Sequence, residues 1–373
     1  MRAVDLYRVV LVLVFSASLS FISESSVNAQ LRTYTVTDLG TLGGQRSAAF
    51  SINNSGQVVG NAETASNESH AFLYEANTLI DLGTLGGKES YAYSISDSCL
   101  IVGRSQNEAG FYRAFITTCA ADSPLVDLSS VDSSLRGHYS TASSVNKAGR
   151  TVGYTVTAAG SHQGGRSRSF LFSNNRIVDL GTLGGEESVP TAINDAEQIV
   201  GYVSREPHAT YADHRAFLYQ NGRIVDLGTL GGRMTTPLAM NSSGAVVGNA
   251  QTSGGLPRAF IYNGRLQGLG TLPGGSQSMA FGINNLGQVV GSSDNQTRTL
   301  HAFLYSKGTI KDLNDLIPTF SGWILVEARS INDSGQIVGN GILRGQERGF
   351  LLTPVDLAQA DTAIGFTLPK IVP

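Results

Sequence analysis

The chain has 373 residues, of which 44 are Gly and 15% are charged, and its formal net charge is −3. This balance provides neither the basic excess typical of nucleic-acid binding nor an acidic tail, so we expect no nucleic-acid partner. The abundant Gly favours many short strands joined by tight turns, because Gly adopts positive φ at low cost.

Residues 1–29 are typical of a secretory signal peptide. Arg2 and Arg8 give a basic start, residues 9–15 (VVLVLVF) form a short apolar run, and small residues precede Gln30. We therefore expect cleavage near Ala29 and a secreted protein, extracellular or periplasmic. We expect no membrane span after signal removal, because no later segment is long and apolar enough. An uncleaved anchor is the alternative.

Seven related segments follow at intervals of 42 to 52 residues. Four of them read DLGTLGG, and the others begin at Asp127 (DLSSVDSS), Gly268 (GLGTLPGG) and Asp312. Each is followed by a phrase like SINNSGQVVG (51–60) and then by a phrase like HAFLY (70–74), the last of which is RGFLL (348–352). Asn, Ser and Gly between short apolar runs predict hairpins, so one unit contains four strands, which we name A, B, C and D.

Four strands in about 45 residues is the size of a β-propeller blade. The chain starts its repeats with a lone D-type strand at 34–39 (YTVTDL) and ends them with a C-type strand at 349–352 (GFLL). These two fragments complete one blade, which is how a ring closes. The sequence thus predicts an all-β, seven-bladed β-propeller of four-stranded blades over residues 30–354. Six or eight blades and a linear β-solenoid are the alternatives, and the tail at 355–373 could supply a competing last strand.

The two faces of such a ring differ in what they carry. The A–B and C–D turns lie on one face, and the B–C loops and DLGTLGG crossovers lie on the other. DLGTLGG recurs once per blade, which indicates a structural role. The B–C loops vary in length, and variable loops on a repeated scaffold commonly carry binding. Glu206, Tyr211 and Asp213 of the loop at 202–214 are candidate binding residues.

A basic residue precedes strand C in every unit. These seven candidates are His70, Arg113, Arg168, Arg215, Arg258, His301 and Arg348. One interpretation is structural, in which each residue pairs with the Asp of its own blade or donates to crossover carbonyls. The other is a ring that binds acidic sugars or other anions. Arg258 faces Gly268, in the blade that lacks the Asp.

The two cysteines belong to the same unit. Cys99 occupies the A–B turn position that Gly56 fills in the first unit, and Cys119 follows strand C. Both turns lie on one face, so the sequence favours a disulfide in an exported protein. Two free thiols are the alternative.

The phrases HAF (70–72 and 301–303), DLGTLGG and SIN-x-x-GQ resemble the HAF-repeat family of bacterial extracellular proteins over residues 34–353. The resemblance implies secretion and a repeated β fold, in a family without an assigned activity. The chain ends in TLPKIVP rather than in the sorting helix of some members, which favours release.

We therefore predict a secreted, non-enzymatic binding module, a monomer that presents its B–C face to a glycan or an extracellular protein. The six His are scattered and no zinc or phosphate motif is present, so we expect no metal and no cofactor. A glycan-active enzyme is the first alternative, because SINDSGQI (330–337) resembles the Asp-box turn of sialidases. A structural envelope or matrix protein is the second.

Overall fold

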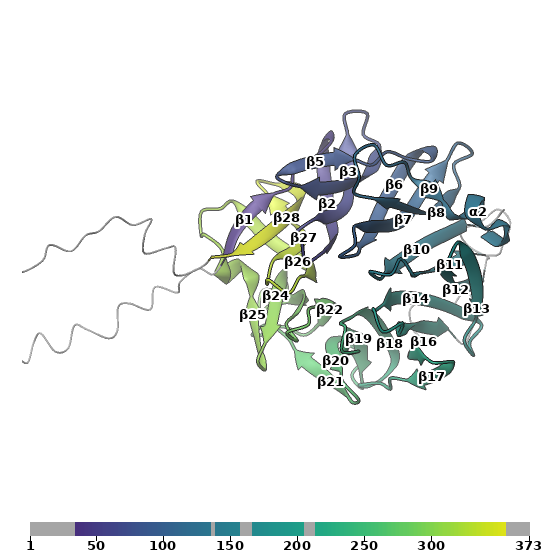
Figure 1. Ribbon diagram of the computed structural model, residues 1–373. Helices are drawn as coiled ribbons and strands as arrows, with labels where there is room; N and C mark the ends of the chain where they lie inside the picture. The colour runs from purple at the N-terminus through teal and green to yellow at the C-terminus, as the bar shows by residue number, and fades with distance from the viewer. Residues whose placement is uncertain (1–33, 136–138, 157–165, 205–212, 356–373) are drawn as a thin grey trace, which may run out of the picture. The chain divides into compact units, whose positions relative to one another are not determined.

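The computed structural model describes residues 34–135, 139–156, 166–204 and 213–355, and all statements below concern these residues. Residues Tyr34–Pro354 form one compact unit. It consists of seven four-stranded antiparallel sheets arranged in a ring (Figure 1). The prediction of a seven-bladed β-propeller is confirmed.

Six blades are built from four consecutive strands each, in the order A, B, C, D. Blade 1 contains β2 (Gly43–Ile52), β3 (Val58–Thr64), β4 (Ser69–Glu75) and β5 (Thr78–Asp81), and blade 2 contains β6 (Gly86–Ile95), β7 (Leu100–Asn107), β8 (Tyr112–Thr118) and β9 (Val126–Asp127). Blade 3 contains β10 (Tyr139–Val145), β11 (Thr151–Val156), β12 (Ser167–Ser173) and β13 (Arg176–Gly181), and blade 4 contains β14 (Glu187–Ile193), β15 (Ile199–Ser204), β16 (His214–Gln220) and β17 (Arg223–Asp226). Blade 5 contains β18 (Gly231–Met240), β19 (Val246–Thr252), β20 (Pro257–Tyr262) and β21 (Leu266–Gly270), and blade 6 contains β22 (Ser278–Ile283), β23 (Val289–Asp294), β24 (Leu300–Ser306) and β25 (Thr309–Asp312).

Blade 7 combines the two ends of the ring. Its strands are β26 (Trp323–Ile331), β27 (Ile337–Leu343), β28 (Gln346–Pro354) and β1 (Tyr34–Asp38). β1 pairs antiparallel with β28, with Val36 opposite Leu352, and the two strands lie side by side in Figure 1. The predicted closure by the first D-type and last C-type strands is therefore confirmed. Residues 1–33, which include the predicted signal peptide, and the tail from residue 356 lie outside the described residues.

The core lies between neighbouring blades. Each blade buries a Phe at the same position of its strand C, namely Phe72, Phe115, Phe170, Phe217, Phe260, Phe303 and Phe350. The cluster around Phe72 in blade 1 also contains Val338 and Leu351 of blade 7. The Gly of the VVG phrase makes room for this ring, because a Cβ on Gly60 would overlap the carbonyl oxygen of Ala48 and lie 2.9 Å from Phe72 Cε1.

The DLGTLGG motif forms the crossover between blades. Asp81 closes an Asx turn, with its Oδ1 accepting the N–H of Gly83 at 2.7 Å, and Gly83 has φ 71°. Thr84 Oγ1 then donates to the carbonyl oxygen of Gly87 at 2.8 Å. Two crossovers depart from this geometry where the motif changes or ends. α2 (Leu128–Val131) and the 3₁₀ turn η1 (Ser133–Leu135) replace the Gly-rich turn at DLSSVDSS, and η3 (Leu313–Leu316) follows β25.

Candidate functional site

The basic residues before strand C are mostly engaged within their own blades. Five of them pair with the Asp at the end of strand D: His70–Asp81, Arg168–Asp179, Arg215–Asp226, His301–Asp312 and Arg348–Asp38. The distances between the charged atoms range from 2.5 Å for His301–Asp312 to 3.8 Å for Arg215–Asp226. This arrangement agrees with the structural interpretation of the ring. Binding by these residues stays a prediction.

The other two basic residues make different contacts, in blade 5, where Gly268 replaces the Asp, and in blade 2, where strand D ends at Asp127. Arg258 donates to the carbonyl oxygen of Ser276 in the next crossover, at 3.2 Å. The guanidinium carbon of Arg113 lies 5.8 Å from the centre of the Phe111 ring. Neither is therefore an isolated cation.

The long loop of blade 4 is described only at its end. Glu206 and Tyr211 lie outside the described residues, as does most of the loop after Val156. Asp213 is half-buried directly before β16. Burial lowers the pKa of its neighbour His214, and the charge of Asp213 opposes that shift.

A cavity of about 190 Å³ lies at the ring axis, on the face of the A–B turns. It is lined by the last residue of each strand A and by the two residues that follow it. The residue directly after strand A is Asn in six blades and Ser96 in blade 2. The six are Asn53, Asn146, Asn194, Asn241, Asn284 and Asn332. This face is opposite to the one that the sequence favoured for binding.

Each of these Asn side chains joins two blades. The Oδ1 of Asn284 accepts the N–H groups of Leu286 and Gln288 within its own turn. Its Nδ2 donates to Gln288 Oε1 and, at 3.0 Å, to the carbonyl oxygen of Asn332 in the next blade. The amide thus uses both donors and both acceptor positions. Positive φ in these turns falls three residues after the Asn, as at Gly287 (74°) and Glu197 (63°), so the Asn acts through its side chain.

A second ring of hydrogen bonds lies next to the first. The backbone N–H and Nδ2 of Asn285 both donate to the carboxylate of Asp333, at 2.8 Å each. Asp333 in turn donates its N–H to Asn54 Oδ1 at 2.9 Å. Because the polar groups around the cavity satisfy one another across blade boundaries, we interpret the cavity as part of the scaffold.

The boundaries between neighbouring blades, which we call seams, differ more from one another on the B–C face than on the A–B face. The position after the VVG-type Gly in strand B is occupied by Asn61, Arg104, Tyr154, Tyr202, Asn249, Ser292 and Asn340. In blade 7 this residue seals the seam, because Asn340 Oδ1 accepts the N–H of Ala49 in blade 1 at 2.9 Å. In blade 4, Tyr202 stacks on His214 with 3.9 Å between ring centroids. His214 Nδ1 lies 3.3 Å from Thr236 Oγ1 of blade 5.

The seam between blades 2 and 3 contains a pocket of about 110 Å³, which we call the 2–3 pocket. Its lining residues are Arg104, Tyr112, Tyr139, Ser140, Thr141, Tyr154 and Val156. Tyr112 begins strand C of blade 2, Tyr139 begins strand A of blade 3, and Val156 ends strand B. These strand ends place the pocket on the B–C face.

Tyrosine rings surround the guanidinium of Arg104. Its central carbon lies 4.4 Å from the centre of the Tyr112 ring, 5.0 Å from that of Tyr91 and 5.8 Å from that of Tyr93. Register explains the grouping, because Tyr91 lies directly opposite Arg104 across the β6–β7 pair. Tyr112 lies diagonally across the next pair, in which Arg104 opposes Ala114.

Two phenols near the 2–3 pocket, those of Tyr93 and Tyr112, have raised pKa values. Burial raises the pKa of Tyr93 to about 12, against the opposing charge of Arg104. Burial also raises the pKa of Tyr112, as does its hydrogen bond to the Glu89 carboxylate. Both hydroxyls therefore remain available as hydrogen-bonding groups at neutral and moderately alkaline pH.

Sequence reasoning missed the lining residues of the 2–3 pocket. The available signal was variation at one repeated position, since Arg104 stands where the flanking units have Asn61 and Tyr154. Tyr91 and Tyr93 are likewise the aromatic members of a strand that reads SAAFSI in blade 1 and STASSV in blade 3. The pattern identifies unusual blades, but it does not show which side chains meet.

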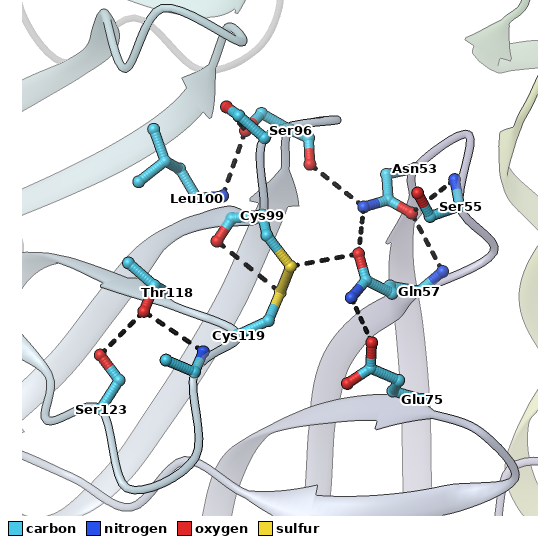
Figure 2. The surroundings of a disulfide bond; sticks show 12 residues. Asn53, Ser55, Gln57, Glu75, Ser96, Cys99, Leu100, Thr118, Cys119 and Ser123 are labelled. Carbon is cyan, nitrogen blue, oxygen red and sulfur yellow. Dashed lines mark hydrogen bonds between the residues drawn. A yellow bond between two sulfur atoms is a disulfide. The ribbon is translucent and has the colours of Figure 1, made fainter.

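The disulfide joins Cys99 in the A–B turn of blade 2 to Cys119 after strand C, with 5.5 Å between the Cα atoms (Figure 2). This is the pairing expected from the turn positions. Cys99 has φ 63°, in a position where other blades place Gly. Figure 2 also shows Gln57 of blade 1 beside the bond, with its side chain held by Asn53 and Glu75.

Two further properties concern the described residues alone. Among them, no group of three or more His, Cys, Asp or Glu side chains is placed to hold a metal ion. In the same ranges, no helix has the length and apolar character needed to span a membrane.

The fold and the 2–3 pocket define the chain as a seven-bladed β-propeller with a small aromatic pocket in one seam. A family model described as "Protein of unknown function (DUF3466)" matches residues 229–356, about a third of the chain. No curated protein sequence matches.

Solved structures share the fold at low sequence identity. The acylaminoacyl peptidase of Pyrococcus horikoshii matches with a TM-score of 0.52 and 10% identity, over 87% of this chain and 55% of the peptidase. This chain thus spans little more than half the length of that enzyme. The β-propeller domain of the trilobed protease from Pyrococcus furiosus matches with a TM-score of 0.50 and 13% identity, over 87% of this chain and 98% of the domain. That domain is described as having an open velcro topology, whereas β1 and β28 close the ring here.

Proposed function

We propose that this chain is a secreted, non-enzymatic binding module that presents its B–C face to a glycan or an extracellular protein. The observation that carries the proposal is the 2–3 pocket, where Tyr112, Tyr139 and Tyr154 surround a hollow on that face. Aromatic walls with a few polar groups are typical of ligand sites. The sequence motif HAF and its counterparts occur in every blade, so we also propose membership of the HAF-repeat family.

The 2–3 pocket is small. Its volume of about 110 Å³ lies below the roughly 300–1,000 Å³ of pockets that bury a drug-sized ligand. It would therefore hold one terminal group or one ring of a larger molecule, while the rest of the ligand lies across the B–C face. A glycan chain or a protein loop meets this condition.

The proposal is tested by screening the full chain on a glycan array and in pull-downs from extracellular fractions, followed by affinity measurement for any ligand found. Tyr154→Ala removes an aromatic wall and should weaken binding at least tenfold. Tyr202→Ala is the matched control, because Tyr202 occupies the equivalent position in blade 4. Equal affinities for wild type and Tyr154→Ala would place the ligand elsewhere and overturn the choice of site.

Secretion has its own test. We expect the protein recovered from the culture medium or the periplasm to begin at Gln30, as measured by N-terminal sequencing. Retention of residues 1–29 on a membrane-bound protein would instead favour the uncleaved anchor.

A glycan-active enzyme remains the alternative function, and turnover of a carboxylated glycan that is abolished by Glu206→Gln or Asp213→Asn would support it.

A further inference from the structure

We propose that the 2–3 pocket binds a carboxylate-bearing sugar residue and that Arg104 is the group that recognises the carboxylate. This inference rests on the proposed function and deepens it, because it assigns a ligand class to the same pocket. It is carried by the position and the charge of one side chain.

Arg104 is held in an orientation suited to a planar anion. Its guanidinium packs against the rings of Tyr112 and Tyr91, at 4.4 and 5.0 Å from their centres. A guanidinium that packs against aromatic rings can still direct in-plane N–H groups at a carboxylate and bind both of its oxygens. The surrounding rings also reduce the side-chain entropy that Arg104 would otherwise lose on binding.

The positive charge of Arg104 has no ion-pair partner among the described residues, in contrast to most basic residues of the C-strand ring. Arg168, for example, lies 2.7 Å from Asp179. The acidic residue next to the cluster is Glu89, and its Oε2 accepts hydrogen bonds from the hydroxyls of Tyr112 and Tyr91. The guanidinium of Arg104 is therefore left to pair with a carboxylate that a ligand supplies.

The tyrosines favour a sugar over a simple anion. A phenol combines an apolar ring, which can pack on the C–H face of a pyranose, with a hydroxyl that donates and accepts hydrogen bonds. Burial raises the pKa of Tyr93 to about 12, so its hydroxyl stays neutral beside a bound anion. An acidic peptide has the carboxylate without the hydroxyls, and it serves as the competing ligand in the test.

The experiment measures the affinity of the full chain for two carboxylated sugars, each beside a neutral counterpart. Oligogalacturonate is compared with its carboxyl-reduced form, and sialyllactose is compared with lactose. A polyglutamate peptide is the third probe. The variants are Arg104→Met, which keeps the apolar stem, Arg104→Lys, which keeps the charge, and Arg233→Met as the control, because Arg233 is exposed near the start of strand A of blade 5 on the same face.

We expect wild type to bind at least one carboxylated sugar at least tenfold more tightly than its neutral counterpart. Arg104→Met should remove this preference, Arg104→Lys should retain part of it, and Arg233→Met should leave it unchanged. The uronate and sialoside arms identify which carboxylated sugar is bound. Circular dichroism and thermal unfolding confirm that each variant is folded.

Three results would overturn the inference. They are equal binding of the charged and neutral sugars, an unchanged preference in folded Arg104→Met, and stronger binding of polyglutamate than of either carboxylated sugar. If the ligand is a neutral glycan or a protein and Tyr154→Ala weakens its binding, the proposed function stands and this inference fails. If Tyr154→Ala leaves ligand binding unaffected, the proposed function fails at its choice of site.

Discussion

Asn332 Nδ2 donates a hydrogen bond of 3.1 Å to the carbonyl oxygen of Asn53, which lies 279 residues earlier in the chain. The bond joins blade 7 to blade 1 at the ring axis, whereas the β1–β28 pairing closes the ring at its rim. The propeller is thus closed at two radii. The outer closure depends on backbone pairing, and the inner closure depends on the Asn side chains that six of the seven blades supply.

Ser96 interrupts the ring of Asn side chains between blades 2 and 3. Its Oγ accepts the N–H of Leu100 at 3.2 Å and so keeps the turn, but it makes no hydrogen bond to Asn146 in the structure as described. We predict that Ser96→Asn completes the ring and raises the free energy of unfolding by about 1 kcal/mol. Urea unfolding measures this change.

The reverse substitution provides the control for Ser96→Asn. Asn332→Ser keeps a turn acceptor and removes the bond to Asn53, so it should lower the free energy of unfolding by about 1 kcal/mol. Changes of the same sign in both variants would contradict the role assigned to the amide ring.

The Gly residues of strand B and of the crossover should respond differently to Ala. A Cβ on Gly60 meets the carbonyl oxygen of Ala48, so Gly60→Ala should cost about 3 kcal/mol or more. Gly83 has φ 71° and open space around the added Cβ, so Gly83→Ala should cost only about 1–2 kcal/mol through backbone strain. Thermal and urea unfolding of both variants distinguish these effects, and equal costs would refute the close-packing explanation for VVG.

The repeat predicted the scaffold well because the relevant interactions recur in every blade. Asn221-Gly222, for example, has φ 51° and 75°, as the hairpin chemistry requires. The 2–3 pocket was not predictable, because it depends on Arg104, Tyr112 and Tyr139 meeting across a seam. The sequence shows that these residues differ from their counterparts, but only the packing of two blades shows that they share one hollow.

Asp294 should make the stability of blade 6 depend on acid pH. Burial opposes ionisation, but hydrogen bonds from Gln277, Ser276 and Arg298 outweigh it and lower the pKa of Asp294 to about 2. Because the folded-state pKa lies below the ordinary value, the carboxylate stabilises the fold above about pH 4. That contribution, about 2 kcal/mol, is lost as the pH falls from about 4 to about 2.

Asp294→Asn tests this pH dependence, since it keeps an acceptor for Ser276 and Gln277 but does not titrate in this range. We expect the difference in unfolding free energy between wild type and Asp294→Asn to shrink by about 2 kcal/mol between pH 4 and pH 2. Urea unfolding at a series of pH values measures it. A difference that is independent of pH would show that the acceptor geometry alone matters.

The disulfide should stabilise the propeller through blade 2. Cys99 and Cys119 are separated by 20 residues, and a crosslink over such a loop contributes about 2–4 kcal/mol in the chain-entropy model. The double variant Cys99→Gly, Cys119→Ser removes the bond while placing Gly at the turn position with φ 63°, where Gly56 stands in blade 1. This choice avoids adding backbone strain to the loss of the crosslink.

We expect the variant to unfold at a lower urea concentration than wild type. In reductant, the unfolding midpoint of wild type should approach that of the variant. Two titratable thiols in unfolded, unreduced protein would show instead that the bond does not form.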